Sequence, residues 1–151
     1  MEKVNNEDVV SLIKDWSETF GLPILKEKGF PSQDRIDLSI KLIKEELQET
    51  QDAIALNDFQ ETEDGLGDLL WVTVRAMMEM GINPLEVIQK IYESNMSKAD
   101  NTVEDAIFTY KHYMDKGIST YSKERNGKFI TYRSEDNKVL KSARNFKRPE
   151  L

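Results

Sequence analysis

The stretch DFQETEDGLGDLLWVTVRAMMEMG, residues 58–81, decides the fold. Asp58 with Glu61 three positions later is a capping-box arrangement that begins a helix, and Gly81 ends it. Between them the apolar side chains are so dense that the helix is apolar almost all round. Such a helix is typical of the interior of a bundle, so we expect it to be buried. The sequence therefore predicts an all-α protein built around residues 58–81.

Four further helices and a β-hairpin are predicted on either side of this stretch. Apolar residues recur at helical spacing, and Gly and Pro residues mark the ends of the segments. The two segments around Asn126-Gly127 alternate in polarity, which indicates a hairpin. The expected helices cover about 6–20, from after Ser32 to Asn57, 84–97 and 102–117, and the expected strands cover 118–125 and 128–133. This is an antiparallel helical bundle with a short C-terminal β-hairpin and a basic tail.

The composition of the 151 residues limits the classes of function. With 38% hydrophobic and 32% charged residues, the chain is expected to fold as one domain, with a helical catalytic bundle over 1–117 and the hairpin and tail (118–151) packed on it. There is no Cys and only one His, which excludes Cys-ligated zinc, thiol nucleophiles and multi-His metal sites. His112 is expected to be a surface or packing residue rather than a catalytic base. Any chemistry must use carboxylates, Lys, Arg and hydroxyl groups.

Charge is distributed unevenly along the chain. Residues 1–105 carry 10 Lys and Arg against 23 Asp and Glu, whereas residues 106–151 carry 11 against 5. The acidic body argues against binding to nucleic acid or to an anionic membrane surface. No apolar run approaches the length of a membrane span, and the polar start does not resemble a signal peptide. We therefore expect a cytoplasmic protein.

Five acids are predicted to lie at one level of a helical hairpin. On each of the two central helices they are one turn apart, and like charges at that spacing crowd one face. If these helices are antiparallel and turn near Asn57, residues at equal height have numbers that add up to a nearly constant value. By this criterion the acids of both helices meet. They are Glu45, Glu46, Glu49, Asp64 and Asp68.

This cluster predicts a metal site. Oxygen ligands without His or Cys suit Mg²⁺, or Mn²⁺, which also bind substrate phosphates. The alternative is a solvated acidic surface, which is common on exposed helices. Asp68 favours the metal, because it directly precedes an apolar run in which an unpaired carboxylate is costly. The same height criterion, with a turn near Gly81, places Asn95 beside Asp68 and Lys98 beside Asp64, where they can contact a triphosphate or a base.

Three motifs together resemble a known family. They are EELQE (residues 45–49), DGLGDLLWV (64–72) and SNMSK (94–98). The pattern is similar to that of the all-α nucleoside triphosphate pyrophosphohydrolases, in the MazG-like and phosphoribosyl-ATP pyrophosphohydrolase-like branch. The resemblance runs from about Trp16 to Lys98, and the tail sequence KVLK (138–141) is also similar to that of some members.

The resemblance implies a fold, an activity and roles for the site residues. Family members are helical bundles that form dimers, sometimes dimers of dimers, and cleave NTPs or dNTPs between the α- and β-phosphates to release pyrophosphate. Some clean up the nucleotide pool. By position, the metal-handling acids are Glu45, Glu46, Glu49 and Asp68, and the nucleotide contacts are Asn95 and Lys98. Glu46 is the expected general base, which takes a proton from a metal-bound water.

This chain departs from the commonest family pattern at three positions. Gly65 stands where a Glu usually precedes the final Asp by three residues, and Asp64 supplies the acid one position earlier. Some members share this DxxxD form, so Asp64 is included among the expected ligands. Ser17 and Ser39 stand where His and Arg are frequent in relatives.

Other functions remain open at this stage. A phosphoribosyl-ATP pyrophosphohydrolase uses the same chemistry on a different substrate. A noncatalytic helical adaptor would use the acidic face for a basic partner, and a nucleic-acid module would use the tail with Phe129, Tyr132 and Phe146. The apolar surface of the bundle predicts at least a homodimer, or a homotetramer. We also hypothesise that Lys138, Lys141 and Arg144 of the tail close over the nucleotide.

Overall fold

A computed structural model describes residues 8–151 and contains the five predicted helices and the hairpin. The chain forms two compact units, one up to Leu85 and one from Glu86 to Leu151. The units divide the chain by packing, at a different place from the change in charge near residue 105. Within residues 8–151, no helix combines the length and the apolar character needed to cross a bilayer.

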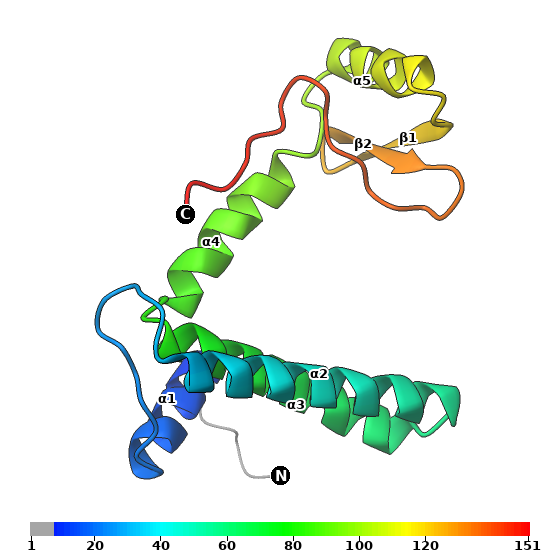
Figure 1. The fold of residues 1–151 in the computed structure, drawn as a ribbon. Helices are drawn as coiled ribbons and strands as arrows, with labels where there is room; N and C mark the ends of the chain where they lie inside the picture. Colours follow the sequence, from blue (N-terminus) through cyan, green and yellow to red (C-terminus); the bar gives the residue numbers. More distant parts are fainter. Residues whose placement is uncertain (1–7) are drawn as a thin grey trace. The chain divides into compact units, whose positions relative to one another are not determined.

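The first unit is a helical hairpin with a short helix packed on it (Figure 1). It comprises α1 (Val9–Thr19), α2 (Gln33–Ala55) and α3 (Phe59–Glu79). Helices α2 and α3 lie side by side along their length, and α1 packs on α3. The predicted antiparallel hairpin is therefore confirmed. The first two residues of the predicted first helix, 6 and 7, lie outside the described residues.

The ends of these helices follow the predicted signals. The Asp58 side chain accepts a hydrogen bond from the Glu61 amide at 3.1 Å, which caps the start of α3. Asn57 in the preceding turn has φ 54°, a left-handed conformation that Asn tolerates. At the other end Gly81, with φ 65°, lies so close to the Glu27 backbone that a side chain would clash. These contacts fix both ends of α3.

The core of the first unit is small. Ile13, Val74 and Met78 are buried together, and Trp71 packs on them, with its ring centroid 5.5 Å from that of Trp16. Helix α3 is not buried all round, contrary to prediction: Leu66 and Leu70 are about half exposed, at 53% and 51%. The physical reason is that α1 and α2 are the helices that pack on α3 within the first unit, and they leave one side of α3 uncovered in that unit.

The second unit holds most of α4 together with the hairpin and the tail. It comprises α4 (Pro84–Met96), which begins at the junction, α5 (Val103–Asp115), β1 (Thr120–Arg125) and β2 (Lys128–Arg133). The strands are antiparallel around the predicted Asn126-Gly127 turn and lie against α5 (Figure 1). The first strand begins two residues later than predicted. The tail adds a bridge between Val139 and Tyr132 of β2.

Candidate active site

The five predicted acids lie on either side of a close contact between α2 and α3. A Cβ atom built on Gly65 would lie 2.5 Å from Thr50 Oγ1 and 3.2 Å from Thr50 Cα, so the two backbones nearly touch. Thr50 is buried, and its hydroxyl donates a hydrogen bond to the Glu46 carbonyl oxygen at 2.7 Å. One turn back along α2 is Glu46, and one turn forward along the antiparallel α3 is Asp68. The close contact therefore brings these two carboxylates to the same level.

The pKa of the Glu46 carboxyl is affected by the acids around it. Partial burial raises the pKa of the Glu46 carboxyl above its usual value, and the negative charges around it raise it further. The charge with the largest effect is Asp68 on the opposite helix. The other contributors, in decreasing order, are Glu49, Glu45 and Asp64. All five predicted acids thus form one interacting group, as the height criterion predicted.

The surroundings of the acids are more open than predicted. Glu45, Glu49, Asp64 and Asp68 are exposed, and only Glu46 is half-buried. The expectation of a buried Asp68 is wrong for a single chain, because the exposed side of α3 also carries Leu66 and Leu70. Asp64 and Asp68 line a shallow depression beside Gly67 and Trp71. The exposed Glu45 forms an ion pair with Lys41 at 3.6 Å.

The donor set suits a hydrated divalent cation. Within the described part of the chain, no three acidic or His side chains stand close enough together to hold a metal ion. Mg²⁺, however, keeps several of its waters and takes one or two protein carboxylates together with substrate phosphates. Carboxylates around Glu46 on two helices fit that mode of binding. Burial raises the pKa of the Glu46 carboxyl most, and the neighbouring carboxylates raise it further.

The predicted nucleotide contacts belong to the second unit. Asn95, in the last turn of α4, is exposed, and Lys98 follows in the next turn and is half-buried. The Lys98 amide donates to the Asn95 carbonyl oxygen at 3.2 Å, so the two residues share one turn. Their approach to the acids of the first unit stays a prediction.

Sequence reasoning missed a buried group of charges at the other end of the helical hairpin. The Glu79 carboxylate accepts hydrogen bonds from the guanidinium groups of Arg75, at 2.7 Å, and Arg35. Arg75 also donates to the hydroxyl of Ser17 at 3.0 Å. Glu79, Arg75 and Ser17 are buried, so Ser17 has a structural partner in this chain. The height criterion for the hairpin of α2 and α3 also brings Arg35 and Glu79 to one level, so the sequence held a signal for this pair.

The structure also shows the surroundings of Gly65 and of His112. Thr50 leaves no space for a side chain at position 65, and the residue there is Gly. His112 packs edge-on against Tyr113, with ring centroids 5.1 Å apart, in keeping with the predicted packing role.

Comparison with known proteins identifies the family. The sequence profile of phosphoribosyl-ATP pyrophosphohydrolase matches residues 13–95, from α1 to the end of α4. The chain belongs to the phosphoribosyl-ATP pyrophosphohydrolase family. The matched region contains all five acids and Asn95, and the predicted resemblance is thereby confirmed.

A viral protein is similar over a longer stretch. The chain is 31% identical, over 134 residues, to an uncharacterized protein of Acanthamoeba polyphaga mimivirus. The alignment covers 80% of this chain and 52% of the viral protein, so the chain spans about half the length of that relative.

Proposed function

We propose that this protein is a Mg²⁺-dependent nucleoside triphosphate pyrophosphohydrolase. It adds water across the α–β phosphoanhydride of an NTP or dNTP, which yields the nucleoside monophosphate and pyrophosphate. The observation that carries the proposal is the close contact of Gly65 with Thr50, which brings Glu46 of α2 and Asp68 of α3 to one level. Glu45, Glu49 and Asp64 lie near enough to act on the Glu46 carboxyl as well. Membership of a pyrophosphohydrolase family supports the reaction type.

Each acid has a proposed role. Glu45, Glu46, Glu49, Asp64 and Asp68 hold the cation, with Mn²⁺ able to replace Mg²⁺. The bound ion supplies charge neutralisation of the triphosphate and lowers the pKa of a coordinated water. Glu46 accepts the proton of the attacking water, because a raised carboxyl pKa brings a general base closer to the working pH. Asn95 and Lys98 bind the nucleotide through their amide and ammonium groups.

A second substrate is favoured by the family match itself. Phosphoribosyl-ATP contains the same α–β anhydride, and the matching profile carries its name. The discriminating experiment is a screen of the common NTPs, dNTPs and phosphoribosyl-ATP with Mg²⁺, with separate quantification of pyrophosphate and the monophosphate. We expect equal amounts of the two products and dependence on Mg²⁺. Release of orthophosphate in place of pyrophosphate would contradict the proposed reaction. No release with any substrate would contradict the proposal as well, and would favour a noncatalytic acidic adaptor.

We also propose that the protein is at least a homodimer, with a homotetramer as the next possibility. Apolar side chains on the outer sides of α2 and α3 are about half exposed in the single chain, more than a monomer of this size usually leaves open. They include Ile40, Leu47, Leu66 and Leu70. Multi-angle light scattering should give at least twice the 17.5 kDa chain mass. A monomer at every concentration contradicts this expectation.

A further inference from the structure

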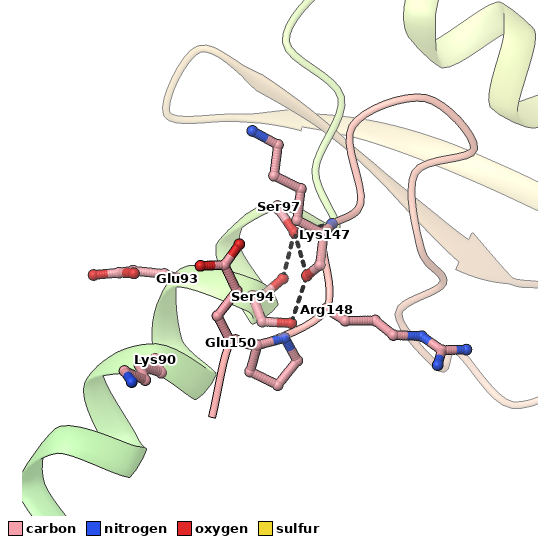
Figure 2. Close-up of a pocket in the computed structure, with 8 residues that line it drawn as sticks. Lys90, Glu93, Ser94, Ser97, Lys147, Arg148 and Glu150 are labelled. Atoms are coloured by element: carbon pink, nitrogen blue, oxygen red, sulfur yellow. Dashed lines mark hydrogen bonds between the residues drawn. The ribbon is translucent and has the colours of Figure 1, made fainter.

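The tail is fastened to the turn that carries the proposed nucleotide contacts. The Ser94 hydroxyl donates to the Lys147 carbonyl oxygen at 2.8 Å, and the Lys147 amide donates to Ser97 Oγ at 2.9 Å. Ser97 in turn donates to the Ser94 carbonyl oxygen at 2.6 Å. Figure 2 shows these bonds as a closed set between the end of α4 and the tail. They fix the backbone on both sides of Asn95, whose own side chain is exposed.

A second contact between the tail and the turn lies at Lys98, the residue after Ser97. The Ser142 amide donates to the Lys98 carbonyl oxygen at 2.9 Å. The Ser142 hydroxyl donates to Asp100 Oδ1, and the Asp100 backbone pairs in both directions with Phe129 of β2. Lys98 therefore lies between two points that the tail and the hairpin hold in place.

Buried polar groups join these contacts into one unit. Asp100 and Thr109 are fully buried and Ser142 nearly so. The Thr109 hydroxyl donates to Asp100 Oδ1 at 3.1 Å and accepts from the Ala143 amide at 3.0 Å. Among the described residues, Asp100 Oδ2 has no hydrogen-bond partner. A buried carboxylate with an unpaired oxygen contributes little to stability. Its hydrogen bonds from Thr109 and Ser142 nevertheless hold these two residues in defined positions.

The charged side chains of the tail are directed elsewhere. Arg144 forms ion pairs with Asp105, at 3.3 Å, and Glu104, and the Lys141 ammonium lies over the Phe146 ring. In Figure 2 the Lys147 and Arg148 side chains extend away from the serines in different directions. The contacts between tail and turn are thus made by backbone and hydroxyl groups, and their strength does not depend on the positive charge of the tail.

We propose that residues 142–147 form a clasp that holds the turn Ser94–Lys98 in the conformation that contacts the nucleotide, with Ser97 and Ser142 as positioning residues. The inference rests on the proposed function and goes beyond it. An ordered turn does not have to lose conformational freedom when the nucleotide binds, so the clasp strengthens binding without taking part in the chemistry. Its loss should raise KM and leave kcat nearly unchanged.

Single hydroxyl deletions test the clasp. We expect Ser97→Ala and Ser142→Ala each to raise the KM of the triphosphate about three- to tenfold, with kcat within twofold. The Ser97 hydroxyl bonds to both Ser94 and Lys147, and the Ser142 hydroxyl holds Asp100. Ser97→Thr, which keeps a hydroxyl, should restore KM. The matched control is Ser134→Ala, which removes an exposed bond to Ser119 in the same unit, away from the turn. Equal KM values for Ser97→Ala, Ser142→Ala and wild type, or an equal rise in Ser134→Ala, would overturn the proposal.

Amide hydrogen exchange tests the clasp without any substrate. In Ser97→Ala, exchange at residues 95–99 should become at least several times faster than in wild type, while α5 keeps its protection. Unchanged exchange at 95–99 overturns the clasp even if the wild type is active. A wild type that releases no pyrophosphate refutes the proposed function and the nucleotide role of the clasp, and faster exchange in the variant would then still show that the tail orders the turn.

Discussion

The helical hairpin of α2 and α3 holds charge in two opposite ways. Near the C-terminal end of α3, the Glu79 carboxylate is buried between Arg35 and Arg75, so opposite charges compensate one another. Further along the same pair of helices, Glu46 is surrounded by four other acids, and the pKa of its carboxyl is raised. The first arrangement stabilises the fold by itself. In the second arrangement like charges repel one another, and under the proposed function a bound cation would relieve that repulsion.

The largest effect on stability should come from breaking the buried group of Arg35, Arg75 and Glu79. Glu79→Ala leaves the buried Arg75 without its anion, and the loss of one partner of a buried ion pair destabilises by about 3–5 kcal/mol. Glu18→Ala is the matched control, because its pair with Lys14 has the same i,i+4 spacing but is exposed, and should lose less than about 1 kcal/mol. Urea unfolding measures both. Similar losses in the two variants would show that the Glu79 group does not stabilise the hairpin as described.

An intermediate effect should follow from forcing the helices apart at the acids. Gly65→Ala places a methyl group against Thr50, whereas no atom lies within 4 Å of a Cβ at Gly67. Both changes gain the same helix propensity, so the difference between them isolates the steric term. Gly65→Ala should therefore be about 1–3 kcal/mol less stable than Gly67→Ala. Equal stability by urea unfolding would mean that the close contact at Thr50 is absent in solution.

The smallest effect on stability should come from removing the charge of Glu46, which lies among the other four acids. The folded chain keeps a proton on Glu46 at pH values where the unfolded chain has already lost it, so this residue makes the protein less stable as pH rises through that interval. Without metal at neutral pH, Glu46→Gln should be more stable than wild type by about 0.5 kcal/mol. The difference should vanish at a pH below the carboxyl pKa of the unfolded chain. The control, Glu124→Gln on β1, removes one exposed charge outside the cluster.

The two regions also differ in how far sequence alone predicts them. Helix boundaries and the meeting of the acids follow from local signals, such as the Asp58 cap, and from the constant height relation of an antiparallel pair. The Arg75–Glu79 pair has ordinary i,i+4 spacing on α3, but its burial, like the Thr50–Gly65 contact, depends on which faces of the helices meet. The periodicity of apolar residues does not determine which faces meet. It also led to the expectation of a buried Asp68, which is exposed in the structure.

The clasp could not be predicted from the sequence, for a different reason. Its bonds join Ser94 and Ser97 to Lys147, about fifty positions away, through backbone groups and hydroxyls that carry no periodic signal. The charge of the tail suggested contact with the nucleotide or the acidic body. Arg144 does pair with two acids at the end of that acidic body, Glu104 and Asp105. Contact of the tail with the nucleotide stays a prediction.

The most direct test of the proposed function is the rate of pyrophosphate release with saturating Mg²⁺ and nucleotide, in wild type and in Glu46→Gln. Loss of a general base and metal ligand should lower kcat at least about 100-fold, in a variant that without metal is slightly more stable than wild type. A Glu46→Gln protein that releases pyrophosphate at the wild-type rate would contradict the assignment of the acid cluster as the catalytic centre.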